Sequence, residues 1–490
     1  MSRAEVETHS IKVKAAHRYD IVDVVSWPQV AGTRYHFIGI GGVGMSGLAQ
    51  FLIDKHAIVA GSDQTATATT SRLAELGAEI HIGHDAENIN AQTAAVVVSA
   101  AVRPDNPELQ RARQQGCRIY KYAQLLGELM SYFDSIAISG THGKSTTSGW
   151  LVHCLKEAGV EPNFVVGANI LQLEASAGTG ASEFFVAEAC EYDRSFLNFR
   201  PQLACILNIE SDHLDCYRDE ADIIDAFYQF ALGTRPGGLV MANGRDPNVA
   251  QVIKRLGRER DVTTFGFDPH CDFSARNIRL HHGLYHFDVY QGQRCLGRTS
   301  ISLPGRHNIL NGLAVTAIAM RVGIEPETIL NVLSRFTGME RRLMLKGKLQ
   351  GITVLDDYAH HPTEIRASLK AIRQRYRPKR LWCVYQAHQY SRTRFFLEEF
   401  AASFALADKA IIPDIYFVRD SELSRSEVNA EILTDRIRAE GTDAEYAGTF
   451  DTVCDRLEKE LCAGDLVVTM GAGDVWKVAD ECIQRLRTNR

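Results

Sequence analysis

A short glycine-rich loop that also holds a lysine and several hydroxyls offers the most specific chemistry in this sequence. It reads Ser-Gly-Thr-His-Gly-Lys-Ser-Thr-Thr over 139–147, between a strand-like and a helix-like segment. The amides of such a loop can cradle phosphates, Lys144 can reach the β- and γ-phosphates, and the hydroxyl of Ser145 or Thr146 can hold Mg²⁺. Ile138 stands where the full motif has its first glycine, so the loop is shortened. We predict a nucleoside triphosphate site.

A second glycine loop lies near the N-terminus. Gly39, Gly41 and Gly44 fit G-x-G-x-x-G between a strand-like run and a helix-like run, and Asp63 ends the next strand-like run. Such a loop brings amides up to a diphosphate, and an acid at that place binds a ribose in dinucleotide enzymes, so the loop alone favours NAD. Two phosphate loops in one chain are hard to explain in a dehydrogenase. We expect ATP to drive chemistry on a second phosphorylated substrate.

Acidic and histidine clusters follow two strand-like segments of the phosphate-loop region, at 188–193 and 210–215. Ligands of open α/β sheets bind at the carboxyl ends of the strands, where these clusters lie. Either cluster taken alone fits a solvated loop that caps the next helix as well as it fits a metal site. Two clusters at neighbouring strand ends favour Mg²⁺ near a γ-phosphate.

Four further segments could extend the site. Gly305 to Asn311 could read an adenine edge, although an ordinary helix cap competes with that reading. The pair Arg341 and Arg342 could neutralise a transferring phosphoryl group. Residues 356–364 hold two acids and two histidines, more than capping needs. Residues 386–394 supply cations for a carboxylate or phosphate.

The elements that must position these residues form three series. Apolar runs alternate with helix-like stretches, which is typical of parallel sheets wrapped by helices, and residues 262–303 alternate as antiparallel hairpins do. The predicted fold is therefore α/β with three domains, with a hinge at Gly347–Gly351. The divisions are 1–33 as an N-terminal extension, 34–133 and 134–347 as the first two domains, and 348–490 as the third.

Composition narrows the class of protein. The 490 residues carry a net charge of -6 and no basic tract, which argues against nucleic acid as a partner. No apolar run reaches the ~18 residues of a membrane span, and the N-terminus has no signal core, so we expect a cytoplasmic protein without membrane insertion. The eleven cysteines contain no C-x-x-C pair, and we expect reduced thiols.

From about residue 34 the chain resembles the Mur ligase family. The shortened loop Gly140 to Thr147 marks the family, and three segments at 39–47, 356–364 and 388–394 point to the member that acts on L-alanine. The resemblance implies a Rossmann-like N-terminal domain for UDP-N-acetylmuramate, a central P-loop ATPase-type parallel sheet with added antiparallel strands, and a Rossmann-like C-terminal domain for L-alanine. The lactyl carboxylate would attack ATP, with Mg²⁺, to give an acyl phosphate that the amine of L-alanine displaces.

The resemblance also implies roles for individual residues. The catalytic residues would be Lys144, Glu188, His213 and Arg392, and the metal ligands Ser145, Thr146, Glu188 and His213. The ATP-binding set would be Gly140, Thr141, His142, Gly143, Lys144, Ser145, Thr146, His307, Asn308, Asn311, Arg341 and Arg342. The UDP-sugar set would be Gly39, Gly41, Gly42, Gly44, Met45 and Asp63, and the amino-acid set Asp357, Tyr358, His360, His361 and His388.

The chain departs from the family pattern at four positions, which are Cys190, Glu340, Ala387 and Gln389. The family often has aspartate, glycine, proline and arginine there. Three alternatives stay open: another Mur-type ligase that adds a different amino acid or a peptide, an NAD-dependent oxidoreductase, and a P-loop switch that only hydrolyses nucleotide. Neither the preference among alanine, serine and glycine nor the choice between monomer and homodimer follows from the sequence.

Overall fold

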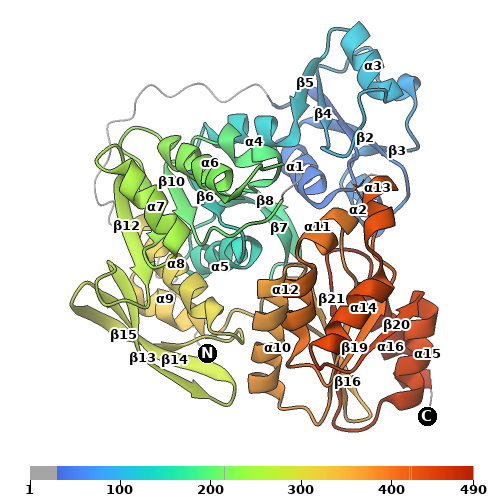
Figure 1. The fold of residues 1–490 in the computed structure, drawn as a ribbon. Helices are drawn as coiled ribbons and strands as arrows, with labels where there is room; N and C mark the ends of the chain where they lie inside the picture. The colour runs from blue at the N-terminus through green and yellow to red at the C-terminus, as the bar shows by residue number, and fades with distance from the viewer. Residues whose placement is uncertain (1–29, 214–215, 419, 421, 489–490) are drawn as a thin grey trace, which may run out of the picture.

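The computed structural model describes residues 30–213, 216–418, 420 and 422–488. These residues form three α/β units, each around its own sheet (Figure 1). Of the predicted extension at 1–33, residues 1–29 lie outside the described residues. Within the described part, no helix is both long enough and apolar enough to cross a membrane.

The first unit is a five-stranded parallel sheet of order β3-β2-β1-β4-β5. Its central strands are almost continuously buried, as strands covered on both faces must be. This order and direction confirm the predicted Rossmann-like domain. The elements are β1 (Arg34–Ile38), α1 (Val43–Asp54), β2 (Ile58–Asp63), α2 (Ala68–Glu75), β3 (Glu79–Ile82), β4 (Ala95–Val98), α3 (Pro107–Gln114), β5 (Arg118–Lys121) and α4 (Tyr122–Met130).

The second unit is a ten-stranded sheet of order β15-β14-β13-β12-β11-β10-β6-β9-β7-β8. Its strands from β13 to β7 are parallel, which includes β12 inside the predicted antiparallel range 262–303. The β13–β14–β15 meander confirms the predicted antiparallel hairpins, and β8 adds an antiparallel strand that was not predicted. Its strands are β6 (Asp134–Ser139), β7 (Asn163–Ile170), β8 (Ala175–Gly178), β9 (Phe184–Glu188), β10 (Leu203–Ile206), β11 (Leu239–Asn243), β12 (Asp261–Gly266), β13 (Phe273–His281), β14 (Leu284–Gln291) and β15 (Arg294–Ser300). Its helices are α5 (Lys144–Glu157), α6 (Glu220–Leu232), α7 (Pro247–Leu256), α8 (His307–Val322) and α9 (Pro326–Leu333).

The third unit is a six-stranded sheet of order β16-β17-β21-β18-β19-β20, parallel except for β16. Its strands are β16 (Met344–Leu349), β17 (Ile352–Asp357), β18 (Leu381–Tyr385), β19 (Lys409–Pro413), β20 (Ala444–Gly448) and β21 (Leu466–Met470). Its helices are α10 (Pro362–Tyr376), α11 (Tyr390–Phe395), α12 (Leu397–Ala401), α13 (Glu422–Glu427), α14 (Ala430–Ala439), α15 (Phe450–Glu460) and α16 (Trp476–Thr488).

The predicted hinge at Gly347–Gly351 is wrong. Those residues form the end of β16 and the turn into β17, and both strands belong to the third sheet. The chain passes from the second unit to the third just before Met344. Arg341 and Leu343 there have φ values of 56° and 46°, in the left-handed region that side chains other than glycine rarely adopt.

The three units are joined in two different ways. One hydrophobic cluster runs through the first two units. In it, the ring centres of Phe51 on α1 and Phe185 on β9 lie 5.2 Å apart. The third unit has hydrophobic clusters of its own, built from residues 343–486. Its contacts with the second unit at the site include hydrogen bonds and ion pairs. Polar groups at that junction are therefore available for chemistry.

Candidate functional site

A cavity of about 1680 Å³ is lined by residues of all three units. The first unit contributes α1 and α2, the second contributes the shortened phosphate loop and the segments after β9 and β10, and the third contributes the segment after β17 and the start of α10. The ends of parallel strands meet here, which is where open α/β sheets bind ligands.

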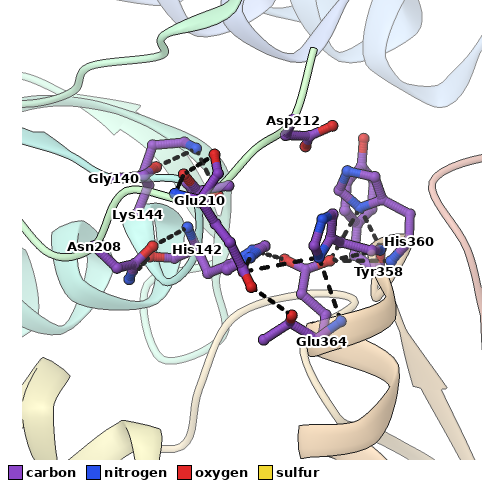
Figure 2. A network of polar contacts seen from close by, with 12 residues as sticks. Gly140, His142, Lys144, Asn208, Glu210, Asp212, Tyr358, His360 and Glu364 are labelled. Atoms are coloured by element: carbon purple, nitrogen blue, oxygen red, sulfur yellow. Dashed lines mark hydrogen bonds and ion pairs between the residues drawn. The ribbon is translucent and has the colours of Figure 1, made fainter. Parts of the chain in front are cut away.

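The shortened phosphate loop connects β6 to α5. Gly140 and Gly143 have φ values of 146° and 84°, which only glycine adopts readily, and a Cβ on Gly143 would lie 2.8 Å from the Asn311 side chain. The Lys144 ammonium donates to the carbonyls of Gly140 at 2.6 Å and Thr141 at 3.0 Å, as Figure 2 shows for Gly140. The lysine is thus held at the mouth of a loop that can wrap phosphates.

The partner of Lys144 is Glu191, whose carboxylate lies 2.8 Å from its ammonium. Burial lowers the pKa of Lys144, but the acidic groups around it, Glu191 first among them, together outweigh burial and raise it. Burial likewise tends to raise the pKa of Glu191, and Lys144 and His213 bring it below its ordinary value. Sequence reasoning placed Glu191 in an acidic cluster but assigned the role there to Glu188.

Glu188 ends β9 and accepts a hydrogen bond from the amide of Gly167 at 2.8 Å. Its carboxylate lines the cavity together with Ser145 and Thr146. Cys190, one of the four departures, lines the cavity beside them. Hydroxyl and carboxylate groups predicted as metal ligands thus line the same cavity.

Arg392 reaches the second unit from α11. Its guanidinium donates to the carboxylate of Asp212 at 3.1 and 2.8 Å, and one nitrogen lies 3.3 Å from Nδ1 of His213. Burial tends to raise the pKa of Asp212, but Arg392 holds it well below its usual range. The predicted residues Arg392 and His213 are therefore brought together, and the carboxylate that joins them is one that sequence reasoning did not single out.

His142 spans the junction between the second and third units. Its ring lies between Glu364 of α10, at 3.0 Å from Nδ1, and Glu210, at 2.6 Å from Nε2 (Figure 2). Burial would lower the pKa of His142, but the two carboxylates raise it to about 10. His142 was predicted as an ATP-binding residue, and its side chain is directed at the third unit.

The two neighbouring arginines have different surroundings. Arg342 lies 3.4 Å from the hydroxyl of Ser145, so it faces the phosphate loop. Arg341 instead donates to Asp356 at 3.1 Å and to the carbonyl of Gly471 at 2.7 Å. Both guanidinium groups lie over the Tyr358 ring, at 5.1 and 4.6 Å from its centre.

The start of α8 brings the three residues predicted for adenosine to the cavity. His307, Asn308 and Asn311 all line it. The Asn311 amide donates to Asn308 at 2.9 Å, and the Asn308 amide donates to the carbonyl of Pro304 at 2.7 Å. Burial lowers the pKa of His307 to about 4, so its ring is neutral near pH 7.

The predicted amino-acid residues separate into two groups. Asp357, Tyr358 and His360 line the cavity. The ring of His361 packs against that of Phe396, with 5.0 Å between the ring centres, and the ring of His388 stacks on that of Tyr416, with 5.5 Å between the centres. Those last two side chains do not belong to the cavity lining.

The glycine loop of the first unit is built around Asp63. The amide of Gly41 donates to the Asp63 carboxylate at 2.9 Å, and a Cβ on Gly44 would lie 2.9 Å from the Tyr122 ring. The cavity is lined by the adjoining Val43, Ser46 and Gly47. The residues predicted for the UDP-sugar are not part of this lining; they are Gly39, Gly41, Gly42, Gly44, Met45 and Asp63.

Two other departures from the expected pattern have local explanations. Glu340 accepts a hydrogen bond from the amide of Asn169 at 2.8 Å, which ties the segment before Arg341 to β7. Gln389 is buried directly before α11, with a φ of 72°, and the hydroxyl of Thr393 donates to its carbonyl at 2.7 Å.

Comparisons with known proteins cover nearly the whole described chain. Three family models match it: "Mur ligase family, catalytic domain" at 34–134, "Mur ligase middle domain" at 138–319 and "Mur ligase, glutamate ligase domain" at 341–473. The UDP-N-acetylmuramate--L-alanine ligase of Clostridium novyi (strain NT) is 41% identical over 448 residues, which cover 91% of this chain and 96% of that protein.

Solved structures have the same architecture. A UDP-N-acetylmuramate-alanine ligase from Thermotoga maritima matches with a TM-score of 0.79 at 25% identity, over 93% of this chain and all of that one. A MurF ligase from Thermotoga maritima in complex with ADP matches with a TM-score of 0.61 at 16% identity, over 88% of this chain and 96% of that one, and shows the fold alone.

Proposed function

The chain belongs to the Mur ligase family, and on that premise we propose that it joins L-alanine to the lactyl carboxylate of UDP-N-acetylmuramate, with conversion of ATP to ADP and phosphate. One observation carries the proposal. A phosphate loop with its lysine shares one cavity with the histidine-rich segment of the third unit, and Arg392 of that unit donates to Asp212 in the cavity lining. A ligase that brings three substrates together needs such a cavity, whereas a dehydrogenase does not need the third unit.

Phosphorylation solves the chemical problem of this reaction. A carboxylate is a poor acylating agent because oxide is a poor leaving group, and transfer of the γ-phosphate turns that oxygen into phosphate. Catalysis is then mainly a matter of position and charge. Lys144 would leave Glu191 for the β- and γ-phosphates, and Arg342 beside Ser145 would face the same phosphates.

Mg²⁺ fits the oxygen ligands of this cavity. Ser145, Thr146 and Glu188 present two hydroxyls and a carboxylate, which are the hard oxygen donors that Mg²⁺ prefers. When bound, Mg²⁺ would neutralise charge on the phosphates. His213 fits less well, because the Arg392 guanidinium can only donate and so the nearby Nδ1 must accept from it. We propose that His213 positions Arg392.

The amino acid would approach from the third unit. The carbonyl of Tyr358 lies 3.1 Å from Nδ1 of His360, so that nitrogen carries the proton. Burial lowers the pKa of His360 to about 4, and the ring is neutral near pH 7. A neutral imidazole does not repel the amino group of L-alanine. In this proposal Arg392 would act on the acyl phosphate from the third unit, next to Asp212 of the cavity lining.

A phosphate-release assay tests the function. We expect release from ATP only when UDP-N-acetylmuramate and L-alanine are both present, and loss of release in Lys144→Ala. Lys156→Ala is the matched control, because Lys156 is an exposed lysine near the other end of α5. Equal release without UDP-N-acetylmuramate would overturn the proposal, and hydride transfer to NAD would support the oxidoreductase instead.

A further inference from the structure

Three potential metal-ligand side chains from two units meet beside the phosphate loop. They are His142 in the loop, Glu210 after β10 and His361 directly before α10, and one ligand atom of each lies within 4.8 Å of the others. Figure 2 shows His142 and Glu210 in contact at this junction. Neither Glu210 nor this grouping was singled out from the sequence.

Each of the three side chains has a second partner that fixes its direction. Glu364 lies 3.0 Å from Nδ1 of His142, and the Thr363 hydroxyl donates to Oε1 of Glu210 at 2.7 Å. Nε2 of His361 lies 3.2 Å from the carbonyl oxygen of Ser211, which can only accept. A carboxylate, hydroxyl or carbonyl behind each ligand is the usual outer shell of a protein metal site.

With these outer partners in place, the other ligand atom of each side chain faces the ligand atoms of the other two. Oε2 of Glu210 lies 2.6 Å from Nε2 of His142 and 3.9 Å from Nδ1 of His361. The Thr363 amide donates to that Nδ1 at 3.3 Å and would have to give way to an ion. The ion would also displace to solvent the proton that Nε2 of His142 shares with Glu210. Small side-chain movements would then bring three ligands to the distance of about 2 Å that a metal ion requires.

We propose that His142, Glu210 and His361 bind a divalent transition-metal ion of the zinc class. Two imidazoles and one carboxylate form a ligand set that Zn²⁺ uses in proteins, and the two imidazole nitrogens disfavour Mg²⁺, which prefers oxygen ligands. His142 and Glu210 line the cavity, so a fourth position of the ion can face it. The site is thus separate in residues and in chemistry from the proposed Mg²⁺ ligands.

The ligands come from both sides of the domain junction. His142 and Glu210 belong to the second unit, and His361 belongs to the third. A bound ion would therefore clamp the two units together. Zn²⁺ would inhibit a ligase that must open to release its product, and this second step rests on the proposed function whereas metal binding does not.

Binding is tested on the full chain with Zn²⁺ alone, without substrates, by equilibrium dialysis, and with Co²⁺ as a spectroscopic probe. We expect one ion per chain in the wild type and loss of that ion in Glu210→Gln and His361→Gln. Thr363→Val removes the hydroxyl that donates to Glu210, together with its contact from the exposed Arg366, and should weaken binding by roughly 10- to 100-fold. Thermal unfolding of each metal-free variant checks that it is folded.

Controls address the other groups that bind zinc. His282→Gln changes a histidine whose ring lies 4.1 Å from that of His281, and a double change of the exposed Cys295 and Cys462 to serine removes two thiols. Binding should persist in all of them. Loss of the ion in a control, unchanged binding in Glu210→Gln and His361→Gln, or no binding in the wild type would overturn the site and leave the cluster as an ion pair only.

Inhibition is measured separately, by phosphate release in excess Mg²⁺ with added Zn²⁺. We expect inhibition of the wild type and, relative to its own activity, at least tenfold weaker inhibition of Thr363→Val. If phosphate release never depends on L-alanine while Zn²⁺ still binds, the proposed function fails and the zinc site stands. If release is normal and Zn²⁺ inhibits both proteins equally, the clamp is overturned.

Discussion

The ammonium of Lys144 lies 2.8 Å from the carboxylate of Glu191, and both side chains are largely buried. The lysine that should hold phosphates is therefore paired with an internal anion. When ATP binds, its phosphates must replace Glu191 as the anionic partner of Lys144. The pair makes the phosphate loop stable before nucleotide arrives, and Glu191 competes with nucleotide for the lysine.

Glu191→Gln tests this competition. Because the change leaves a buried ammonium without its carboxylate, we expect the free protein to lose about 3 kcal/mol of unfolding free energy. ATP supplies replacement charge, so it should raise the melting temperature of the variant more than that of the wild type. Glu183→Gln, at an exposed position just before β9, is the control. Equal shifts in all three proteins would contradict the competition.

Arg392→Lys tests the contact across the junction. A lysine keeps the charge but cannot donate in parallel to Asp212, so we expect phosphate release to fall roughly 100-fold or more. Arg394→Lys is the matched control, since Arg394 lies on the same helix and pairs with Glu427 at the surface. Similar activity in both variants would show that the paired geometry of Arg392 is not needed.

Arg342→Ala should mainly lower activity, whereas Arg341→Ala should mainly lower stability. Arg342 faces Ser145, so its loss should raise the KM for ATP or lower kcat by at least tenfold. Arg341 holds the buried Asp356, so its loss should cost about 3 kcal/mol of unfolding free energy. Steady-state kinetics and urea unfolding of both variants separate the two roles. The prediction fails if Arg341→Ala has the larger kinetic effect and Arg342→Ala the larger effect on stability.

The sequence predicted those parts of the fold whose pattern is local. The loop around Lys144 and the alternating residues of β13 to β15 carry their own signals, and both were recognised. Strand β16 was missed because Met-Leu-Lys-Gly-Lys-Leu does not alternate strictly, and this placed the hinge wrongly at Gly347–Gly351. Strand β20, Ala-Glu-Tyr-Ala-Gly, has too few large apolar residues to be recognised.

The sequence predicted which segments form the site, but not which residues within those segments contact one another. Sequence reasoning found the clusters that hold Glu191 and Asp212 but could not decide which carboxylate meets Lys144 or Arg392. Those choices depend on the backbone after each strand and on how two units pack. The contact between His142 and Glu364 joins residues 222 positions apart, and no local pattern indicates such a pair.

The carboxyl of Asp357 should make stability depend on pH. It is buried, and burial raises its pKa from 3.8 to about 6, although the Ser368 hydroxyl at 2.5 Å and Arg342 oppose the shift. In the unfolded chain the carboxyl ionises near pH 3.8, whereas the folded protein resists ionisation until about pH 6. The group therefore favours folding fully at low pH, and this contribution is lost as the pH rises through about 6.

Asp357→Asn removes the ionisable group and should flatten that part of the pH profile. A shift of about two pKa units corresponds to about 3 kcal/mol. We expect the wild type to lose up to that amount of unfolding free energy, relative to the variant, between about pH 4 and pH 7. Urea unfolding at several pH values measures the difference, and Asp451→Asn at an exposed position of α15 is the control. Parallel profiles for the wild type and Asp357→Asn would mean that the folded protein ionises Asp357 as readily as the unfolded chain does.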